Sequence, residues 1–416
     1  MDSYVVPSEI RGSITAPPSK SMTQRAIAAS LLAAGESIVI NPSDCDDSVA
    51  AMSIASALGA DVINEPGRLR ITGSGELRER QLNCGESGLA IRMFSPIAAL
   101  NDAEIILTGT GSLAGRPMSM IEEALSQLGV KCKSQNGFLP LRIKGPLKGG
   151  TCEIDGSLSS QLLTGLLMAL PVAERDSVII VNNLKSKPYI DMTLQVLDSF
   201  GIRVERTDYS RFIITGNQIY RPRKFVVEGD WSGGAFLLVA GAINGDINVE
   251  GLRPDSRQSD KAILNVLDSA GVRTTIMENS ISVVKSKPKP FFFDATESPD
   301  LFPPLAALAA FCGGTSTIKG VSRLIHKESN RAMALVNEFS RINIKVETDD
   351  DNMMITGGMV KGGEISSHGD HRIAMAAAVA ALGATGKILI RDSGCVAKSY
   401  PSFYEHLRKL GALIYE

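Results

Sequence analysis

One pattern recurs six times along this chain and limits its fold more than any other feature. An amphipathic helical segment ends at a small turn residue, and an apolar, strand-like run follows it. Glycine, with asparagine as its substitute, suits the left-handed conformation that often follows a helix. The period exceeds that of common solenoid repeats, so each repeat is expected to be a sizeable α/β motif. The turn residues are Gly59, Gly129, Gly201, Gly271, Asn343 and Gly411, which are 70, 72, 70, 72 and 68 residues apart.

A second helical segment also occurs once per repeat, and it is apolar almost all the way round. Helices of this kind are buried, yet each segment carries polar or charged residues in its first turn. If these first turns converge, their dipoles create a place that attracts anions. The segments read SMTQRAIAASLLAA, ESGLAIRMFSPIAAL, LSSQLLTGLLMAL, DWSGGAFLLVAGAI, SPDLFPPLAALAAF and GDHRIAMAAAVAAL.

Strand-like runs such as SIVIN, EIILTG and KILIRD flank these helices, so the sequence predicts an α/β or α+β fold with helices packed under sheets. Turn signals at APPSK and RPRKFVVEGD divide the six repeats into three and three. We therefore expect two similar domains, one formed by residues 19–227 and the other by residues 228–416 together with residues 1–18.

Composition restricts the partners of the chain. The net charge of −2 gives no global field for nucleic acid or membranes, so any recognition of anions must be local. The longest apolar runs are too short to span a bilayer, and the N-terminus lacks the pattern of a signal peptide. A cytoplasmic location is the default expectation.

Metal and nucleotide motifs are missing from the sequence. The six cysteines stand singly, which favours reduced thiols over a zinc site or disulfides. No P-loop, HExxH or GxSxG motif occurs. His368 and His371 lie in SHGDHR, where helix capping or hydrogen bonding explains them better than metal binding. We therefore expect no metal and no cofactor.

Several cations fall at or near the first turns of the apolar helices. A single lysine or arginine is usually a solvated surface charge, but a cation at the mouth of a buried helix cannot easily be buried unpaired. Arginine suits bidentate binding of carboxylate or phosphate, and lysine acts as a point charge. The candidates are Lys20, Arg25, Arg92, Arg116, Lys327, Arg331, Arg372 and Lys398.

Two acidic residues and two hydroxyl-rich stretches complete the candidates. Asp300 heads SPDLFPPLAALAAF and could simply cap a helix, whereas Glu328 could form a local ion pair with little effect. Alternatively, one accepts a proton from a substrate hydroxyl and the other donates one, which requires a shared cleft. The stretches SLSSQ and KSKPY supply hydroxyl and amide groups that suit phosphate oxygens.

Eight motifs, in this order, resemble the 3-phosphoshikimate 1-carboxyvinyltransferase (EPSP synthase) family from about residue 12 to the C-terminus. They are PSKSMTQRA, LAGRP, GSLSSQLLTGLLMALP, SKPYIDMT, SPDLFPPLAALAA, HKESNRA, GDHRIAMA and CVAKSYPSF. The resemblance implies two domains of three βαβαββ-type repeats each, an inside-out α/β barrel with buried parallel helices, and an active site in the interdomain cleft. It also implies transfer of enolpyruvate from phosphoenolpyruvate to shikimate 3-phosphate, with release of phosphate, by addition and elimination through a tetrahedral intermediate in a monomer.

The resemblance also implies roles for individual residues. Asp300 would take the proton of the attacking 5-hydroxyl, Glu328 would protonate the methylene carbon, and Lys20 would assist departure of phosphate. The residues implied to bind shikimate 3-phosphate are Lys20, Ser21, Arg25, Ser159, Ser160, Gln161, Ser186, Asp300, Arg323 and Lys327. Those implied to bind phosphoenolpyruvate are Lys20, Gly88, Arg116, Gln161, Arg331, Arg372 and Lys398.

The chain departs from the family pattern at several positions, and two other functions stay open. Glu86 and Leu89 replace an Asn and a Thr, Asn330 replaces a common Asp, and Arg323 stands where an Asn often binds substrate. The sister enzyme that uses UDP-N-acetylglucosamine shares the fold, but it has Lys-Asn where this chain has Lys20-Ser21. A non-catalytic anion-binding module is the other alternative, and the presence of Asp300, Glu328 and Lys398 argues against it.

Overall fold

The computed structural model of the protein describes residues 1–73, 75–325 and 327–416. These residues form two compact units. Unit 1 contains Met1–Pro17 and Glu228–Glu416, and unit 2 contains Pro18–Val227. The structure thus differs from the expected boundaries by one residue, Pro18, which directly precedes the capping residue of the first helix of unit 2.

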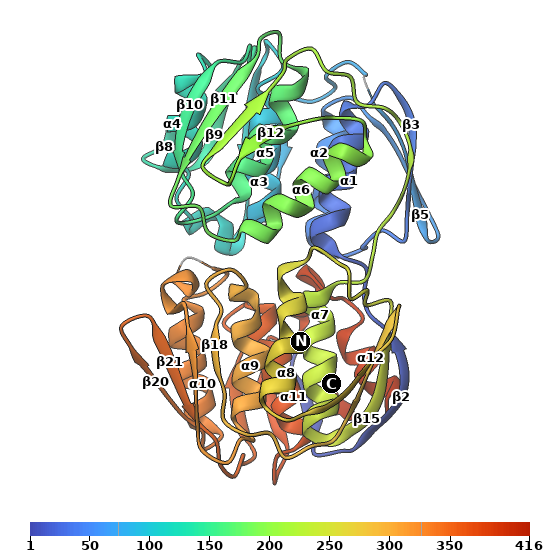
Figure 1. Ribbon diagram of the computed structural model, residues 1–416, viewed down its shortest axis with the longest axis vertical. Helices are drawn as coiled ribbons and strands as arrows, with labels where there is room; N and C mark the ends of the chain where they lie inside the picture. Colours follow the sequence, from blue (N-terminus) through green and yellow to red (C-terminus); the bar gives the residue numbers. More distant parts are fainter. Residues whose placement is uncertain (74, 326) are drawn as a thin grey trace. The chain divides into compact units, whose positions relative to one another are not determined.

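The apolar helices form the interior of each unit, as their uniform hydrophobicity predicts. Every residue of α3, α9 and α11 is buried. In unit 2, α3 packs against α1 and α5, and in unit 1 the helices α7, α9 and α11 contact one another (Figure 1). The interior helices are α1 (Lys20–Leu32), α3 (Gly88–Ala98), α5 (Gln161–Ala169), α7 (Trp231–Asn244), α9 (Phe302–Ala309) and α11 (His371–Leu382).

The second set of helices is amphipathic, and each helix ends where the repeat predicts. All six predicted turn residues have positive φ, from 70° at Gly271 and Asn343 to 116° at Gly59. Left-handed backbone therefore terminates the same helix in every repeat. These helices are α2 (Asp46–Ala57), α4 (Ser119–Gln127), α6 (Lys187–Ser199), α8 (Ile263–Ser269), α10 (Arg331–Arg341) and α12 (Phe403–Lys409).

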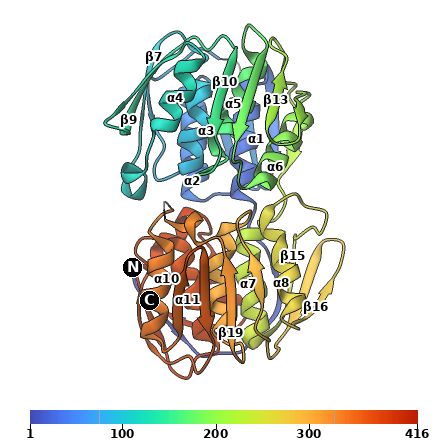
Figure 2. The ribbon, with the colours of Figure 1, turned by 60° about the vertical axis from the view of Figure 1, so that its left-hand side comes forward.

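Each repeat owns one four-stranded sheet that lies outside the interior helices (Figure 2). In every sheet one edge strand pairs in parallel with its neighbour, and the other two pairs of strands are antiparallel. Buried and exposed residues alternate along strands such as β10, because one face covers the helices and the other faces solvent.

The sheets of unit 2 have the orders β14-β3-β5-β4, β6-β7-β9-β8 and β10-β11-β13-β12. Their strands are β3 (Gly35–Ile40), β4 (Asp61–Glu65), β5 (Arg68–Gly73), β6 (Gln81–Asn83), β7 (Glu104–Thr108), β8 (Lys131–Gln135), β9 (Phe138–Lys144), β10 (Thr151–Asp155), β11 (Ser177–Asn182), β12 (Glu205–Thr207), β13 (Arg211–Ile214) and β14 (Lys224–Val226).

The sheets of unit 1 have the orders β16-β17-β15-β2, β18-β19-β21-β20 and β22-β23-β1-β24. Their strands are β1 (Ser3–Val6), β2 (Ile10–Thr15), β15 (Gly245–Glu250), β16 (Arg273–Ile276), β17 (Ser280–Val284), β18 (Phe292–Asp294), β19 (Thr315–Lys319), β20 (Lys345–Asp349), β21 (Asn352–Thr356), β22 (Gly363–Ser366), β23 (Ile388–Arg391) and β24 (Leu413–Tyr415).

The two N-terminal strands complete sheets whose other strands come from the second half of the chain. Strand β2 pairs in parallel with β15, and β1 lies between β23 and β24, antiparallel to both. The first residues of the chain are thereby fixed to unit 1, although the chain leaves for unit 2 at Pro18.

Short 3₁₀ helices place several of the side chains discussed below. They are η1 (Gly111–Gly115), η2 (Leu170–Val172), η3 (Ser259–Ala262), η4 (Pro299–Leu301), η5 (Val321–Leu324) and η6 (Ser393–Lys398). All six cysteines are free, and five are buried. Among the described residues, no helix has both the length and the apolarity needed to cross a membrane.

Candidate active site

In unit 2, the first turn of α1 is charged by Lys20 and balanced from the neighbouring helix. Ser19 caps α1, and its hydroxyl accepts from the amide of Met22. The ammonium of Lys20, the first helical residue, lies 2.9 Å from a carboxylate oxygen of Asp47 in the first turn of α2. Both side chains are largely buried. Asp47 therefore offsets the unfavourable placement of a cation at a helix N-terminus and fixes the position of the lysine.

Arg25, one turn further along α1, is a buried cation held by neutral groups. Its guanidinium donates to the hydroxyls of Thr193 and Thr164 and to the carbonyls of Ser21 and Tyr189. The side chain is almost completely buried, and burial lowers the pKa of Arg25 to about 10. No carboxylate among the described residues pairs with it. The positive charge is therefore oriented by hydrogen bonds and available to an incoming anion.

The first turn of α3 is a second place where cations gather. A methyl group on Gly88 would lie 2.7 Å from a guanidinium nitrogen of Arg116 and 2.9 Å from one of Arg92. Arg92 also donates to the side-chain oxygen of Gln161 at 3.0 Å. Only glycine leaves room for two guanidinium groups here, next to a helix N-terminus, and such a place favours a carboxylate or phosphate.

Arg116 is also connected to one of the unusual residues of this chain. Its guanidinium donates to the hydroxyl of Ser112, and that hydroxyl and the Ser112 amide both donate to the carboxylate of Glu86. Glu86 therefore orders η1 and, through Ser112, the side chain of Arg116. The departure from the family pattern at this position adds a negative charge two residues before Gly88.

The predicted hydroxyl groups of unit 2 lie at helix starts. Ser160 directly precedes α5, and the hydroxyl of Ser159 accepts from the amide of Gln161. Ser186 precedes α6 with a left-handed φ of 57°. Ser21 contributes the carbonyl that anchors Arg25. The starts of α1, α5 and α6 thus converge on Arg25, whose bonds reach all three helices.

In unit 1, Arg331 is the centre of a network of buried charges. Its guanidinium contacts Asp300 at 2.9 Å, Glu328 at 2.7 Å and Asp370 at 2.9 Å, and its side chain is completely inaccessible to solvent. Burial would lower the pKa of Arg331, but the three carboxylates raise it above its ordinary value. Arg331 therefore fixes three acids relative to one another, and its predicted contact with phosphoenolpyruvate stays a prediction.

Asp300 lies where three cations meet. Its oxygens are 2.9 Å from Arg331, 3.2 Å from Arg372 and 3.4 Å from Lys327. Burial alone would raise the pKa of Asp300, but these cations hold it well below its usual range. Its carboxylate caps no helix, because Ser298 precedes η4 and Leu301 precedes α9. Asp300 is thus an ionised acceptor, as a proton-abstracting group must be.

The other predicted residues of unit 1 surround this centre. Lys398, at the end of η6, lies 3.8 Å from Glu328. Burial lowers the pKa of Lys327, opposed by Asp300. The positive charge of Arg323, in η5, lowers the pKa of Lys327 further. The ion pair between Glu328 and Arg331 that the sequence allowed is present, but it is one contact in a buried network.

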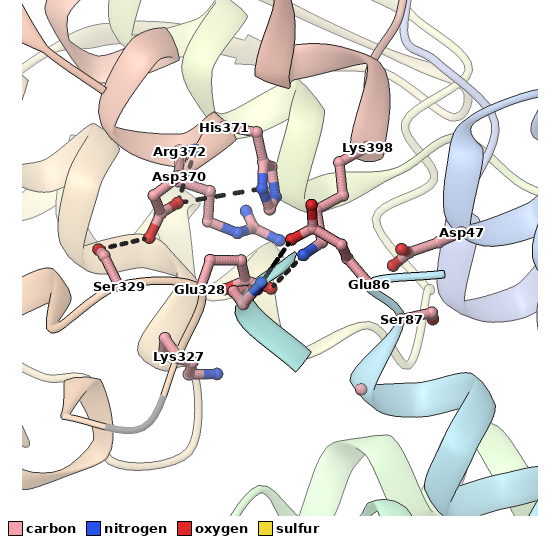
Figure 3. A network of polar contacts seen from close by, with 12 residues as sticks. Asp47, Glu86, Ser87, Lys327, Glu328, Ser329, Asp370, His371, Arg372 and Lys398 are labelled. Carbon is pink, nitrogen blue, oxygen red and sulfur yellow. Dashed lines mark hydrogen bonds and ion pairs between the residues drawn. The ribbon is translucent and has the colours of Figure 1, made fainter. Parts of the chain in front are cut away.

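The start of α11 brings Arg372 to this network. Asp370 caps α11 by accepting from the amide of Arg372, and it accepts from the Ser329 hydroxyl at 3.1 Å (Figure 3). His371 lies 3.9 Å from Asp370. His368 contacts Glu338 on α10 at 2.8 Å, consistent with the predicted hydrogen-bonding role. No group of three or more possible metal ligands occurs within the described ranges.

Sequence reasoning missed the residues that hold the predicted ones in place. Asp47, Thr164, Thr193 and Asp370 all contact candidate site residues. Of these, Asp370 had a local signal, because it stands two residues before Arg372 and directly before a buried helix. The two threonines lie within helices and resemble ordinary helix residues.

The fold and these clusters define a class of protein: an α/β enzyme of two units, each with three repeats, whose buried cations and ionised acids suit small anionic substrates. A sequence model described as EPSP synthase (3-phosphoshikimate 1-carboxyvinyltransferase) matches residues 5–407. A Clostridium perfringens protein named 3-phosphoshikimate 1-carboxyvinyltransferase is 37% identical over 420 residues, covering 99% of each chain. A Methanocorpusculum labreanum protein of the same name is 38% identical over 412 residues, covering 97% of each.

Solved structures agree with these sequence matches. EPSP synthase from Acinetobacter baumannii superposes with a TM-score of 0.84 at 25% identity, and all of both chains is covered. An enolpyruvyl transferase from Streptomyces tendae, 18% identical with a TM-score of 0.82, shares the fold. The chain belongs to the EPSP synthase family. The resemblance seen in its motifs and the expected two-domain inside-out α/β barrel are confirmed.

Proposed function

We propose that this enzyme transfers the enolpyruvyl group of phosphoenolpyruvate to the 5-hydroxyl of shikimate 3-phosphate and releases phosphate, a step of the shikimate pathway toward chorismate and the aromatic amino acids. Membership of the family supports this transferase activity. The observation that carries the proposal is the state of Asp300, an ionised carboxylate in contact with three cations. Such a group can take a proton from a hydroxyl while the neighbouring cations bind the anionic parts of the substrates.

Shikimate 3-phosphate binds mainly through unit 2 in this proposal. The buried charge of Arg25 and the hydroxyls at the starts of α5 and α6 suit a phosphate dianion. The proposed set is Lys20, Ser21, Arg25, Ser159, Ser160, Gln161 and Ser186 in unit 2, with Asp300, Arg323 and Lys327 from unit 1.

Phosphoenolpyruvate needs one group of cations for its phosphate and another for its carboxylate. The space beside Gly88, bordered by Arg116 and Gln161, supports one of these, and Arg372 and Lys398 support the other. The proposed set is Lys20, Gly88, Arg116, Gln161, Arg331, Arg372 and Lys398.

The chemistry divides between addition and elimination. Asp300 accepts the 5-hydroxyl proton as that oxygen bonds to the substituted carbon of phosphoenolpyruvate, and Glu328 supplies a proton to the methylene carbon. In the resulting tetrahedral intermediate that carbon is a methyl group. Glu328 takes back one of its protons as the bond to phosphate breaks, and the departing phosphate, whose charge Lys20 stabilises, takes the proton held by Asp300. Since every step transfers a proton or phosphate between groups already named, we propose that no metal or cofactor is needed.

A phosphate-release assay with different acceptors tests this function. We expect release that depends on both phosphoenolpyruvate and shikimate 3-phosphate, with no release when UDP-N-acetylglucosamine replaces the latter. Release only with UDP-N-acetylglucosamine would instead assign the sister activity. Binding of both compounds without release would indicate a non-catalytic module.

We also propose that the enzyme is a cytoplasmic monomer. The net charge of −2 is too small to draw the chain to membranes or nucleic acid, and the proposed substrates are small molecules. Sedimentation at micromolar concentration should give a mass near 44.3 kDa. Activity that depends on protein concentration would point to an oligomer instead.

A further inference from the structure

A fourth carboxylate, Asp260, lies close to the charged centre of unit 1 and has no role in the chemistry above. It belongs to η3, and its side chain is 2% exposed. One of its oxygens accepts from the hydroxyl of Ser232, and the other is buried without any hydrogen-bond partner. Unlike Asp300, Asp260 forms no ion pair among the described residues. A buried carboxylate with one neutral partner is expensive to ionise, so this arrangement favours a bound proton.

The charged groups around Asp260 come from three neighbouring elements. Asp300 of η4 and Asp230, the capping residue of α7, oppose its ionisation, whereas Arg372 of α11 favours it. Burial is the largest influence, and the pKa of Asp260 rises to about 7. Lys261, on the same short helix, donates instead to the carbonyl of Pro254. Burial, and after it the charge of Asp300, therefore favours a bound proton on Asp260, and the charge of Arg372 opposes it.

The protonation state of Asp260 changes the net charge that surrounds an anionic substrate. The network around Arg331 joins four cations (Lys327, Arg331, Arg372 and Lys398) to three carboxylates (Asp300, Glu328 and Asp370). While Glu328 is ionised, an ionised Asp260 adds a fourth negative charge and cancels the excess, whereas a protonated Asp260 leaves one positive charge for the substrate. The protonated Glu328 that the addition step needs adds one positive charge to either total.

We propose that Asp260 is a positioning residue that takes up one proton when phosphoenolpyruvate binds, which removes a negative charge from the surroundings of Arg372 and Asp300 and leaves the positive charge of Arg372 to the substrate carboxylate or phosphate. The inference rests on the proposed function, because it uses the assignment of Arg372 to phosphoenolpyruvate. Its physical basis is linkage: an anion placed on Arg372 removes the cation that favours ionised Asp260 and adds negative charge beside it. Protonation and anion binding therefore reinforce each other.

Steady-state kinetics across pH 6–9 test the proposal, with saturating shikimate 3-phosphate and varied phosphoenolpyruvate. For the wild type, we expect kcat/KM for phosphoenolpyruvate to fall about ten-fold per pH unit above a break near pH 7, while kcat changes little. Asp260→Asn keeps the shape of the side chain but cannot ionise, so this break should be absent. Ionisation of the substrates affects both enzymes alike, and the ratio of their profiles isolates Asp260.

Ser232→Ala provides a second, independent variant. The Ser232 hydroxyl stabilises the ionised form of Asp260, so its loss should move the break to higher pH. If Asp260→Asn does not fold, the shift in Ser232→Ala decides the matter, and an unchanged break overturns the proposal. An Asp260→Asn profile parallel to that of the wild type, whether at equal or at uniformly reduced activity, also overturns it.

A binding measurement separates failure of this inference from failure of the proposed function. Thermal stabilisation by a fixed concentration of phosphoenolpyruvate reports binding without turnover. We expect this stabilisation to decline above pH 7 in the wild type more steeply than in Asp260→Asn. Equal declines refute the role of Asp260 even if the wild type is fully active. An enzyme that shows the expected decline but releases no phosphate refutes the reaction instead.

Discussion

The two units solve the problem of burying an arginine in opposite ways. In unit 2, Arg25 is surrounded by hydroxyls and carbonyls, and its charge is not neutralised by any carboxylate of the described chain. In unit 1, Arg331 is surrounded by three carboxylates and is neutralised more than once. The consequence for each pKa is opposite too, since that of Arg25 is lowered and that of Arg331 is raised.

This contrast separates binding from chemistry. An unneutralised, oriented guanidinium can capture an anion, because its neutral partners hold it without competing for its charge. A guanidinium shared by three carboxylates offers a substrate less of its charge than Arg25 does, but it keeps several acids at fixed positions. In the proposed function, the Arg25 cluster of unit 2 therefore holds a phosphate, and the Arg331 network of unit 1 holds the acids that exchange protons.

Asp300→Asn is the variant with the largest expected effect. The amide cannot accept the hydroxyl proton, so kcat should fall about 10²- to 10⁴-fold, the range typical of losing a general base. Binding of shikimate 3-phosphate, measured by calorimetry, should change far less. Retention of more than a tenth of kcat would show that another group accepts the proton.

Arg331→Met is expected to act on stability. It leaves three acids without their shared cation, two of them partly and one fully buried, which should lower the free energy of unfolding by about 3–5 kcal/mol. The control is Arg341→Met on the same helix, whose side chain is 60% exposed and should contribute at most about 1 kcal/mol. Equal effects in denaturant titrations would contradict the view that Arg331 organises the centre.

Arg25→Met should show the reverse pattern. Its partners are neutral, and the buried hydroxyls of Thr164 and Thr193 keep their hydrogen bonds to each other and to backbone carbonyls. Stability should therefore change by about 1 kcal/mol, whereas binding of shikimate 3-phosphate should weaken by about 2–4 kcal/mol. Thr193→Val removes one hydroxyl but keeps the charge, and it should weaken binding less. A large loss of stability with unchanged affinity would reverse the roles of the two arginines.

The pH dependence of stability should distinguish Asp260 from Asp300. Between about pH 4 and 7, folded Asp260 keeps a proton that the unfolded chain has lost, so it lowers stability as the pH rises through this window. Asp300, with a depressed pKa, does the opposite, and its contribution disappears only as the pH falls below about 4. The rise of about 3 pKa units corresponds to about 4 kcal/mol. Relative to the wild type, Asp260→Asn should therefore gain roughly 8–16 °C in Tm from pH 4 to 7. A constant difference in Tm would contradict this.

The smallest expected effect comes from an exposed arginine with two carboxylate partners. Arg391 contacts Glu364 and Asp2, but its side chain is 49% exposed. Arg391→Ala should lower stability by about 1 kcal/mol or less, and less still in high salt. A loss as large as that of Arg331→Met would show that burial is not what separates the two sites.

The sequence was informative wherever a residue type is tied to a local backbone role. Glycine and asparagine favour the left-handed backbone found at the six turns, and uniformly apolar helices are expected to be buried. Both features depend on the local sequence alone, so they can be predicted without knowing which residues pack against them. The cations at the helix starts stand out for the same reason, since they oppose the local dipole.

What could not be predicted is which residues from different repeats meet. Arg331 and Asp370 are 39 residues apart, and Arg25 and Thr193 are 168 apart; nothing local to either links them. Asp260 carries no local signal at all, because its burial and its neighbours are set by packing between η3, α7 and η4. The contacts of these residues depend on how the helices pack in the folded protein, so the sequence near each residue does not reveal them.

The position of β1 has a consequence for how the protein is made. This strand is synthesised before unit 2, whereas both of its partners, β23 and β24, follow unit 2 in the chain. Unit 2 holds all of its strands within Pro18–Val227 and can assemble early, whereas unit 1 is complete only after β23 and β24 are made, and its first strand stays exposed until then. Nascent chains stalled before β23 are therefore expected to carry an unpaired edge that chaperones must cover, and moving residues 1–17 to follow Glu416 would remove that delay.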